Sequence, residues 1–286
     1  MSFEIDPPGV GPRPAQTLYT PCAQEIVGAR RPEHPLQRRT AVAKPYPDPM
    51  GAVRADVIDS VCRVLAQAGD PDRAKDQQAY MKSAMPFRGI PAPRLKAILA
   101  PVLADPVYLL GTREAWEATI RELWDDARFR EERYAAIAVC GHRLYRHWAA
   151  DRPAMALYRH LVESGAWWDF VDAIAAHQVG LVLRSHPETE YERMRFWAVA
   201  DSLWVRRAAI LSQLLSKDET NPQLLLDCIT PNLADREFFI RKAIGWSLRQ
   251  YARSGPVAAD WVRGTVNELG PRLSPLSCRE ALKHLG

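Results

Sequence analysis

Trp168 and Asp172 are the first residues in this sequence whose types and spacing suit chemistry. They are four residues apart in the run 167-WWDFVDAIAAHQV-179, so on a helix they share one face. Small alanines follow them and leave room for another molecule to approach the carboxylate. The structural alternative is a capped helix. With Asp169 as N-cap, Asp172 falls at the third helical position, where unpaired backbone amides and the helix dipole favour a carboxylate.

Arg207 interrupts an apolar stripe in the run 203-LWVRRAAILSQLL-215. An arginine in such a stripe most often extends to the edge of the apolar surface or pairs with a carboxylate. The alternative is an anion-binding role, because the planar guanidinium suits phosphate.

Trp246 lies on the polar side of the segment 238-FFIRKAIGWSLRQYARS-254. It projects about 200° around the helix from Ile244 and shares its face with Lys242 and Arg249. The ring either packs against a second helix or forms an aromatic platform in a basic surface, an arrangement that holds nucleic acid. The neighbouring cations predict an exposed ring.

Two windows of the chain concentrate positive charge. Residues 193–217 and residues 236–253 each carry five basic side chains against one acidic side chain, a net charge of +4 in each window. The whole chain of 286 residues also has a net charge of only +4. The windows therefore form either solvated helix faces or a track for phosphates.

The composition is typical of a soluble protein, with 47% hydrophobic and 25% charged residues. The five cysteines lie far apart and do not have the spacing of a zinc site or of a disulfide framework. No apolar run is long enough to span a membrane, and the first residues do not resemble a signal peptide. These features predict a cytoplasmic protein without a structural zinc site.

The elements that must position these side chains are helices. Residues 1–50, with 10 of the 23 prolines before residue 50, are predicted to form an extended or disordered arm, and residues 51–286 a single helical domain. Helical periodicity and breaks at Pro, Gly or Asp predict helices over the following ranges: 54–68, 71–84, 92–104, 112–125, 129–149, 153–164, 169–184, 188–201, 203–216, 222–230, 236–253, 257–269 and 276–285. Many short helices joined by tight turns favour an all-α fold, an α-solenoid of antiparallel HEAT-like repeats with a concave face.

The order of several motifs over residues 72–285 resembles the AlkD-type family of DNA alkylation-repair glycosylases, which are built from HEAT-like repeats. The motifs are WWDFVD, LWVRRAAILSQLL, EFFIRKAIGWSLRQYA and LSCREALKHL, preceded by 79-AYMKSAMPFRGIPAP-93. The resemblance implies that the concave face binds duplex DNA containing alkylated purines.

The resemblance also implies roles for individual residues. It makes Asp172 the catalytic aspartate and places Trp168 and Trp246 beside the lesion. It assigns a phosphate contact to Arg207, and it places Tyr80 near the DNA. Lys242 and Arg249, which flank Trp246, complete the predicted DNA-binding residues.

The activity implied is that of a monofunctional, monomeric glycosylase that hydrolyses the N-glycosidic bond of N7-methylguanine or N3-methyladenine without base flipping. Two alternatives come from other classes of protein. One is a non-enzymatic protein that binds branched or damaged DNA through the same surface. The other is a HEAT-type scaffold for protein interactions, in which Arg207 and Trp246 are ordinary packing residues.

Overall fold

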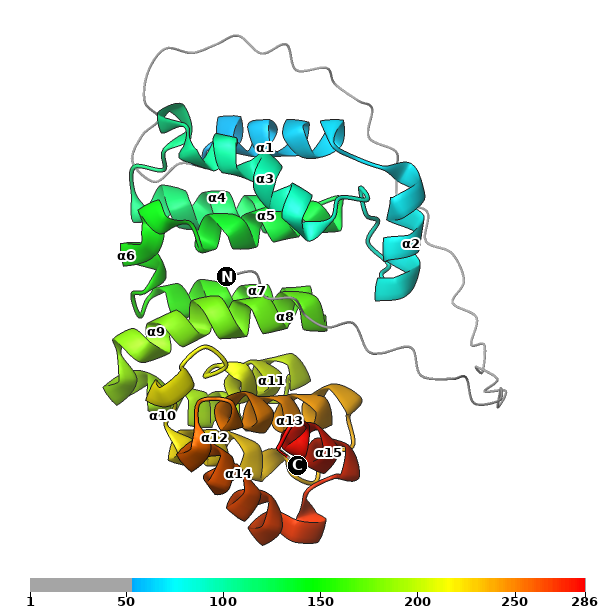
Figure 1. Cartoon of the computed structure of the whole chain (residues 1–286). Helices are drawn as coiled ribbons and strands as arrows, with labels where there is room; N and C mark the ends of the chain where they lie inside the picture. The colour runs from blue at the N-terminus through cyan, green and yellow to red at the C-terminus, as the bar shows by residue number, and fades with distance from the viewer. Residues whose placement is uncertain (1–52, 286) are drawn as a thin grey trace. The chain divides into compact units, whose positions relative to one another are not determined.

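The structure is a computed structural model that describes residues 53–285. The predicted N-terminal arm lies outside these residues. Within them every regular element is a helix, and the helices are stacked in successive pairs (Figure 1). The all-α prediction is therefore confirmed.

In chain order the α-helices are α1 (Ala55–Gln67), α2 (Pro71–Met81), α3 (Ala92–Ala104), α4 (Arg113–Asp125), α5 (Arg130–Cys140), α6 (Arg146–Ala149), α7 (Ala154–Gly165), α8 (Trp168–Ala173), α9 (Gly180–Ser185), α10 (Pro187–Trp197), α11 (Leu203–Leu211), α12 (Pro222–Ile229), α13 (Phe238–Ala252), α14 (Pro256–Leu269) and α15 (Pro275–Leu282). A π-helical segment, Ile174–Val179, joins α8 to α9. Short 3-10 helices cover Pro106–Tyr108, Arg143–Tyr145, Lys217–Glu219, Thr230–Asn232 and Gly270–Arg272.

Local capping explains where several helices begin. The side chains of Thr112, Asn221 and Ser274 accept hydrogen bonds from backbone amides in the first turns of α4, α12 and α15. The helix predicted over 236–253 begins two residues later than expected, at Phe238.

One long helix predicted over 129–149 is divided in the structure. It ends at Cys140, continues through a 3-10 turn and resumes as the one-turn helix α6. Gly141 and His142 leave the helical path at the break, which fits the low helix propensity of glycine. Apart from Tyr80 on α2, the predicted site residues lie beyond this break, in helices whose ranges the periodicity located to within a few residues.

The helices form an α-solenoid with one continuous apolar core. Within pairs, α4 packs on α5, α7 on α8, α10 on α11 and α13 on α14. Between pairs, α8 packs on α11, α11 on α13 and α13 on α15. Hydrogen bonds and ring contacts link α5 to α8, so α5, α8, α11, α13 and α15 form one row, called here the α8 row. Most of the predicted site residues belong to this row.

Gly245 allows α13 and α15 to approach each other very closely. A Cβ atom at Gly245 would lie 2.4 Å from Cβ of Glu280 and 2.7 Å from the carbonyl oxygen of Ser277. A Cβ atom essentially never lies this close to a non-bonded heavy atom, so only glycine fits this crossing.

Candidate functional site

Asp172 and Arg207 form a buried ion pair between α8 and α11. Nε of Arg207 donates to Oδ1 of Asp172 at 2.7 Å, and Nη2 donates to Oδ2 at 2.8 Å. The two side chains are only 4% and 3% exposed. Nη1 of Arg207 also donates to the backbone carbonyl of Phe239 in α13. A parallel, two-pronged bond of this kind is the geometry that guanidinium forms with a carboxylate.

The environment of Asp172 acts on its ionisation in two directions. Burial raises the pKa of Asp172, and the charge and hydrogen bonds of Arg207 oppose this effect without cancelling it. The charge of Asp169, one helical turn earlier, also raises the pKa. Asp172 is thus a carboxyl group whose pKa lies above the ordinary value and whose ionised form is stabilised by a single cation, Arg207.

The capping explanation for Asp172 is wrong. The N-cap of α8 is Trp167, which leaves Asp169 at the second helical position and Asp172 at the fifth. Asp172 is therefore too far along the helix to serve the free amides of the first turn. Arg207, by contrast, pairs with a carboxylate, which is one of the alternatives that the sequence left open.

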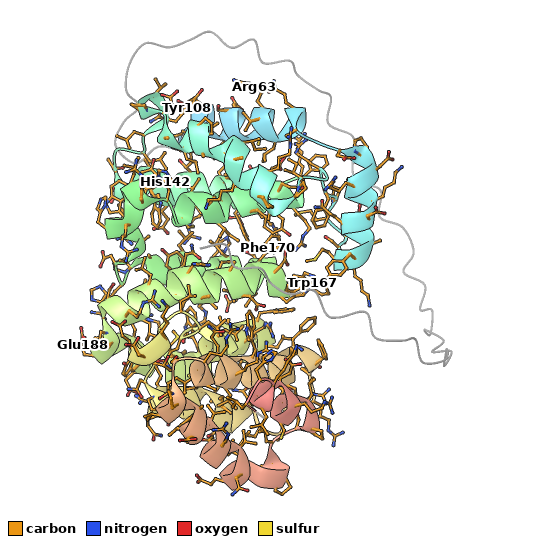
Figure 2. The ribbon with its side chains drawn as sticks, viewed as in Figure 1. Arg63, Tyr108, His142, Trp167, Phe170 and Glu188 are labelled. Carbon is orange, nitrogen blue, oxygen red and sulfur yellow. The ribbon has the colours of Figure 1, made fainter. Side chains whose placement is uncertain are left out.

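Aromatic rings gather at the start of α8. Trp168, four residues before Asp172, is half-buried. Trp167 packs at 5.6 Å from the ring of Phe239 and 6.1 Å from that of Trp204. Figure 2 shows Trp167 at the tip of α8 and Phe170 on the side facing α5. The Phe239 ring also lies beside the ion pair, since its centre is 5.9 Å from the guanidinium carbon of Arg207, although only the tryptophans at 168 and 246 were predicted to matter.

A second buried ion pair links α8 to α5, and sequence reasoning missed it. Nη2 of Arg130 lies 2.6 and 2.7 Å from the two carboxylate oxygens of Asp169. The hydroxyl of Tyr134 donates to the same carboxylate at 2.5 Å. Burial and the charge of Asp169 raise the pKa of Tyr134, so the hydroxyl remains a donor. Nothing in the sequence around residue 130 indicates this partner, which is 39 residues away.

Trp246 is half-buried against the core of the solenoid, so the prediction of an exposed ring is wrong. Its neighbours Lys242 and Arg249 both bind Glu280 of α15, each with a nitrogen 2.6 Å from a carboxylate oxygen. Burial raises the pKa of Glu280, but the hydrogen bonds and charges of these two cations outweigh burial and lower it overall. The cluster of Lys242, Arg249 and Glu280 keeps a net charge of +1.

The basic side chains of residues 193–217 are largely paired with carboxylates, whereas in residues 236–253 the ion pairs are those of Lys242 and Arg249 with Glu280. Arg206 pairs with Asp235 at 2.8 Å, and Arg195 pairs with Asp227 at the same distance. A helical wheel misses such partners because they lie outside the helix that carries the arginine. The two windows are therefore not continuous rows of unpaired cations.

Tyr80 lies on α2, at the other end of the predicted site. Its side chain is 56% exposed. The loop after α2 is held to α5 by Glu131, whose carboxylate accepts hydrogen bonds from the backbone amides of Arg88, Gly89 and Ile90. This anchoring fixes the loop after α2, while the ring of Tyr80 is open to solvent.

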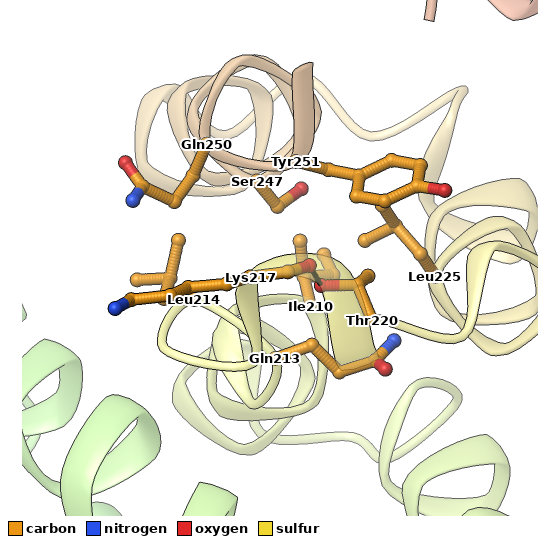
Figure 3. Close-up of a pocket in the computed structure, with 9 residues that line it drawn as sticks. All are labelled: Ile210, Gln213, Leu214, Lys217, Thr220, Leu225, Ser247, Gln250 and Tyr251. Atoms are coloured by element: carbon orange, nitrogen blue, oxygen red, sulfur yellow. Dashed lines mark hydrogen bonds between the residues drawn. The ribbon is translucent and has the colours of Figure 1, made fainter. Parts of the chain in front are cut away.

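Two cavities of the described residues lie away from Asp172. One, between α11 and α13, has space for about one water molecule, with Gln213, Ser247 and Gln250 among its lining (Figure 3). A wider groove of about 480 Å³ lies at α14 and α15, beside Val266 and Leu282. Neither cavity contains a predicted catalytic residue.

Residues 53–285 lack both a membrane-spanning helix and a metal-binding cluster. They contain no helix with the length and apolar character needed to cross a membrane. They also contain no group of three or more His, Cys, Asp or Glu side chains arranged to hold a metal ion.

Comparisons with known proteins agree on one family. A family profile described as DNA alkylation repair enzyme matches residues 61–285. A solved structure, a predicted DNA alkylation repair enzyme from Enterococcus faecalis, is 34% identical, with a TM-score of 0.66 over 76% of this chain and 97% of its own. No protein of curated function matches the chain. The profile covers more than half of the sequence, and the chain therefore belongs to the DNA alkylation repair enzyme family.

Proposed function

We propose that this DNA repair protein is a monofunctional DNA glycosylase that releases cationic alkylated purines, such as N7-methylguanine and N3-methyladenine, from duplex DNA. The observation that carries the proposal is the buried Asp172 carboxylate, held by Arg207 in a setting of aromatic rings. Membership of a DNA alkylation repair family supplies the substrate class.

Release of the base requires a carboxylate that stabilises positive charge more than it requires a general acid. Alkylation at these ring nitrogens makes the base cationic, so it can leave without being protonated. As the glycosidic bond breaks, positive charge develops on the deoxyribose. An ionised Asp172 close to C1′ would stabilise that charge and orient the attacking water.

Arg207 has two proposed roles. It already uses three of the five N–H groups of a guanidinium, two on Asp172 and one on the carbonyl of Phe239, which leaves two. We assign the first role, holding Asp172 charged and oriented, to the three bonds already made. A contact to a DNA phosphate would use the remaining two groups and requires a small outward movement, because the side chain is 3% exposed.

The aromatic and basic residues complete the proposal. The rings of Trp168 and Trp246 would pack against the lesion's sugar and attract its developing charge. Lys242 and Arg249 would contact phosphates, since their cluster with Glu280 keeps a net charge of +1. Tyr80, exposed on α2, would meet the DNA from the other end of the site.

The proposed reaction proceeds without base flipping, a metal or an organic cofactor, and its products are an abasic site and the free base. The proposed setting is a monomer in the cytoplasm. A chain that only binds branched or damaged DNA would use the same surface, and the experiment below separates the two.

Single-turnover release of N7-methylguanine from a duplex tests the function. We expect the parent protein to release the base and Asp172→Asn to be about 10²- to 10³-fold slower, because the amide keeps the shape of the carboxylate but not its charge. Affinity for undamaged duplex should change little. Binding without release by the parent would favour the non-enzymatic protein, and equal rates for both proteins would remove Asp172 from catalysis.

A further inference from the structure

Helix α8 carries two carboxylates, and each is held by an arginine from a different neighbouring helix. Arg207 of α11 binds Asp172, and Arg130 of α5 binds Asp169 one turn earlier. The site proposed above uses only the first pair. The second pair is almost as well buried, with side chains 5% and 11% exposed.

The start of α8 lacks the usual means of holding a helix end. Its N-cap, Trp167, makes no side-chain capping bond, and the helix has only six residues before the π-helical segment begins. A helix start without a capping bond is held weakly by itself. Its first turn is held instead by the contacts of Asp169 with Arg130 and Tyr134.

Arg130 also reaches the loop that follows α2. Its Nη1 donates to Oγ of Ser83 at 3.2 Å, and its backbone amide donates to the carbonyl of Pro86 at 3.0 Å. Its guanidinium carbon lies 4.1 Å from the ring centre of Phe170 in α8. One arginine thus connects the loop after α2 to the first turn of α8.

We infer that Arg130 and Asp169 are a positioning pair that fixes the first turn of α8, and with it Trp168 and Asp172, relative to the loop after α2. The pair does not touch the reacting atoms. It acts by holding the carboxylate in place, since a displacement of about 1 Å can cost about 100-fold in rate. The inference rests on the proposed function only in making Asp172 the reacting carboxylate.

The test compares Asp169→Asn with a matched control, Asp235→Asn. Asp235 also binds an arginine of the α8 row, Arg206, at 2.8 Å, and it accepts one further hydrogen bond, from the amide of Glu237. Both variants therefore lose an arginine partner, but only the first lies in α8. Tyr134→Phe removes one bond to Asp169 and serves if Asp169→Asn does not fold.

The first measurement is amide hydrogen exchange in the free protein. The amide of Val171 donates to the carbonyl of Trp167 at 3.1 Å, so its exchange reports the first turn of α8. We expect this amide to exchange at least about 10-fold faster in Asp169→Asn than in the control. Equal exchange in the two variants would overturn the inference.

The second measurement is the titration of Asp172, followed by carboxyl-carbon NMR. The charged groups that face Asp172 are Arg207 from α11 and Asp169 from its own helix, and Arg130 and Tyr134 face Asp169 from α5. Replacing Asp169 by Asn removes a negative charge and leaves Arg130 unpaired, so Asp172 should titrate at lower pH. An unchanged titration midpoint would show that Asp169 does not act on Asp172 and would contradict the inference.

The third measurement is base release. We expect Asp169→Asn to release N7-methylguanine about 10- to 100-fold more slowly than Asp235→Asn. If the parent releases no base, the proposed function fails, and the exchange and titration results still decide the positioning role. If the parent is active and both variants keep equal rates, the positioning role is refuted.

Discussion

Breaking the Asp172–Arg207 pair should be among the most destabilising single changes in this chain. Arg207→Met keeps much of the side-chain volume but leaves a carboxylate that is 4% exposed without a cation. Removing one partner of a buried pair typically costs about 3 to 5 kcal/mol. For a domain of this size, that corresponds to a fall in Tm of roughly 6 to 20 °C.

The pH dependence of this loss follows from the sign of the pKa shift. Without Arg207, the pKa of Asp172 should rise further above its ordinary value, because burial is then unopposed. A carboxyl group with a raised folded-state pKa favours the folded state as the pH falls. The deficit of Arg207→Met relative to the parent should therefore shrink as the solution is acidified.

Denaturant unfolding of four proteins measures the effect: the parent, Arg207→Met, Asp172→Asn and the double variant. The double variant has no buried charge at this place and should recover part of the loss, with a coupling energy of about 1 to 3 kcal/mol. Arg206→Met, which loses the partly exposed Asp235 partner, is the matched control and should cost less. The reasoning is refuted if Arg207→Met costs no more than this control and its deficit does not change with pH.

Three further outcomes follow from the same geometry. The rate of base release should fall on the acid side with a midpoint above 3.8, the ordinary pKa of an aspartate, because burial raises the pKa of Asp172 and only its ionised form serves. A pH–rate profile with a midpoint at or below this value would contradict the assignment. Glu280→Gln should tighten binding to undamaged duplex and steepen its salt dependence, since it frees Lys242 and Arg249 for phosphates. Affinity measured at several salt concentrations checks this prediction. Unchanged binding would show that neither cation contacts the DNA. Gly245→Ala should lower the free energy of unfolding despite the better helix propensity of alanine, because its Cβ would lie 2.4 Å from a side-chain atom of α15. A higher denaturation midpoint would show that α13 and α15 can move apart.

The sequence by itself was sufficient for the class of fold and for most helices. Apolar residues recur with helical spacing from residue 54 onward, and Thr112, Asn221 and Ser274 signal helix starts that the structure contains. These features are local, since each depends on residues within one or two turns. The exception was the predicted helix over 129–149, where the break at Gly141 was overlooked.

The sequence also indicated Asp172 and Arg207 as candidate functional residues, but it did not indicate that they bind each other. They are 35 residues apart, and their contact depends on the stagger with which α8 packs on α11. The same holds for Arg130 with Asp169, and for Glu280 with the cations of α13. A helical pattern determines which face of a helix is apolar. Which charge meets which across two helices is decided only when the packed core sets their relative positions, and in this chain that step pairs Arg207 with Asp172 and joins Lys242 and Arg249 to Glu280.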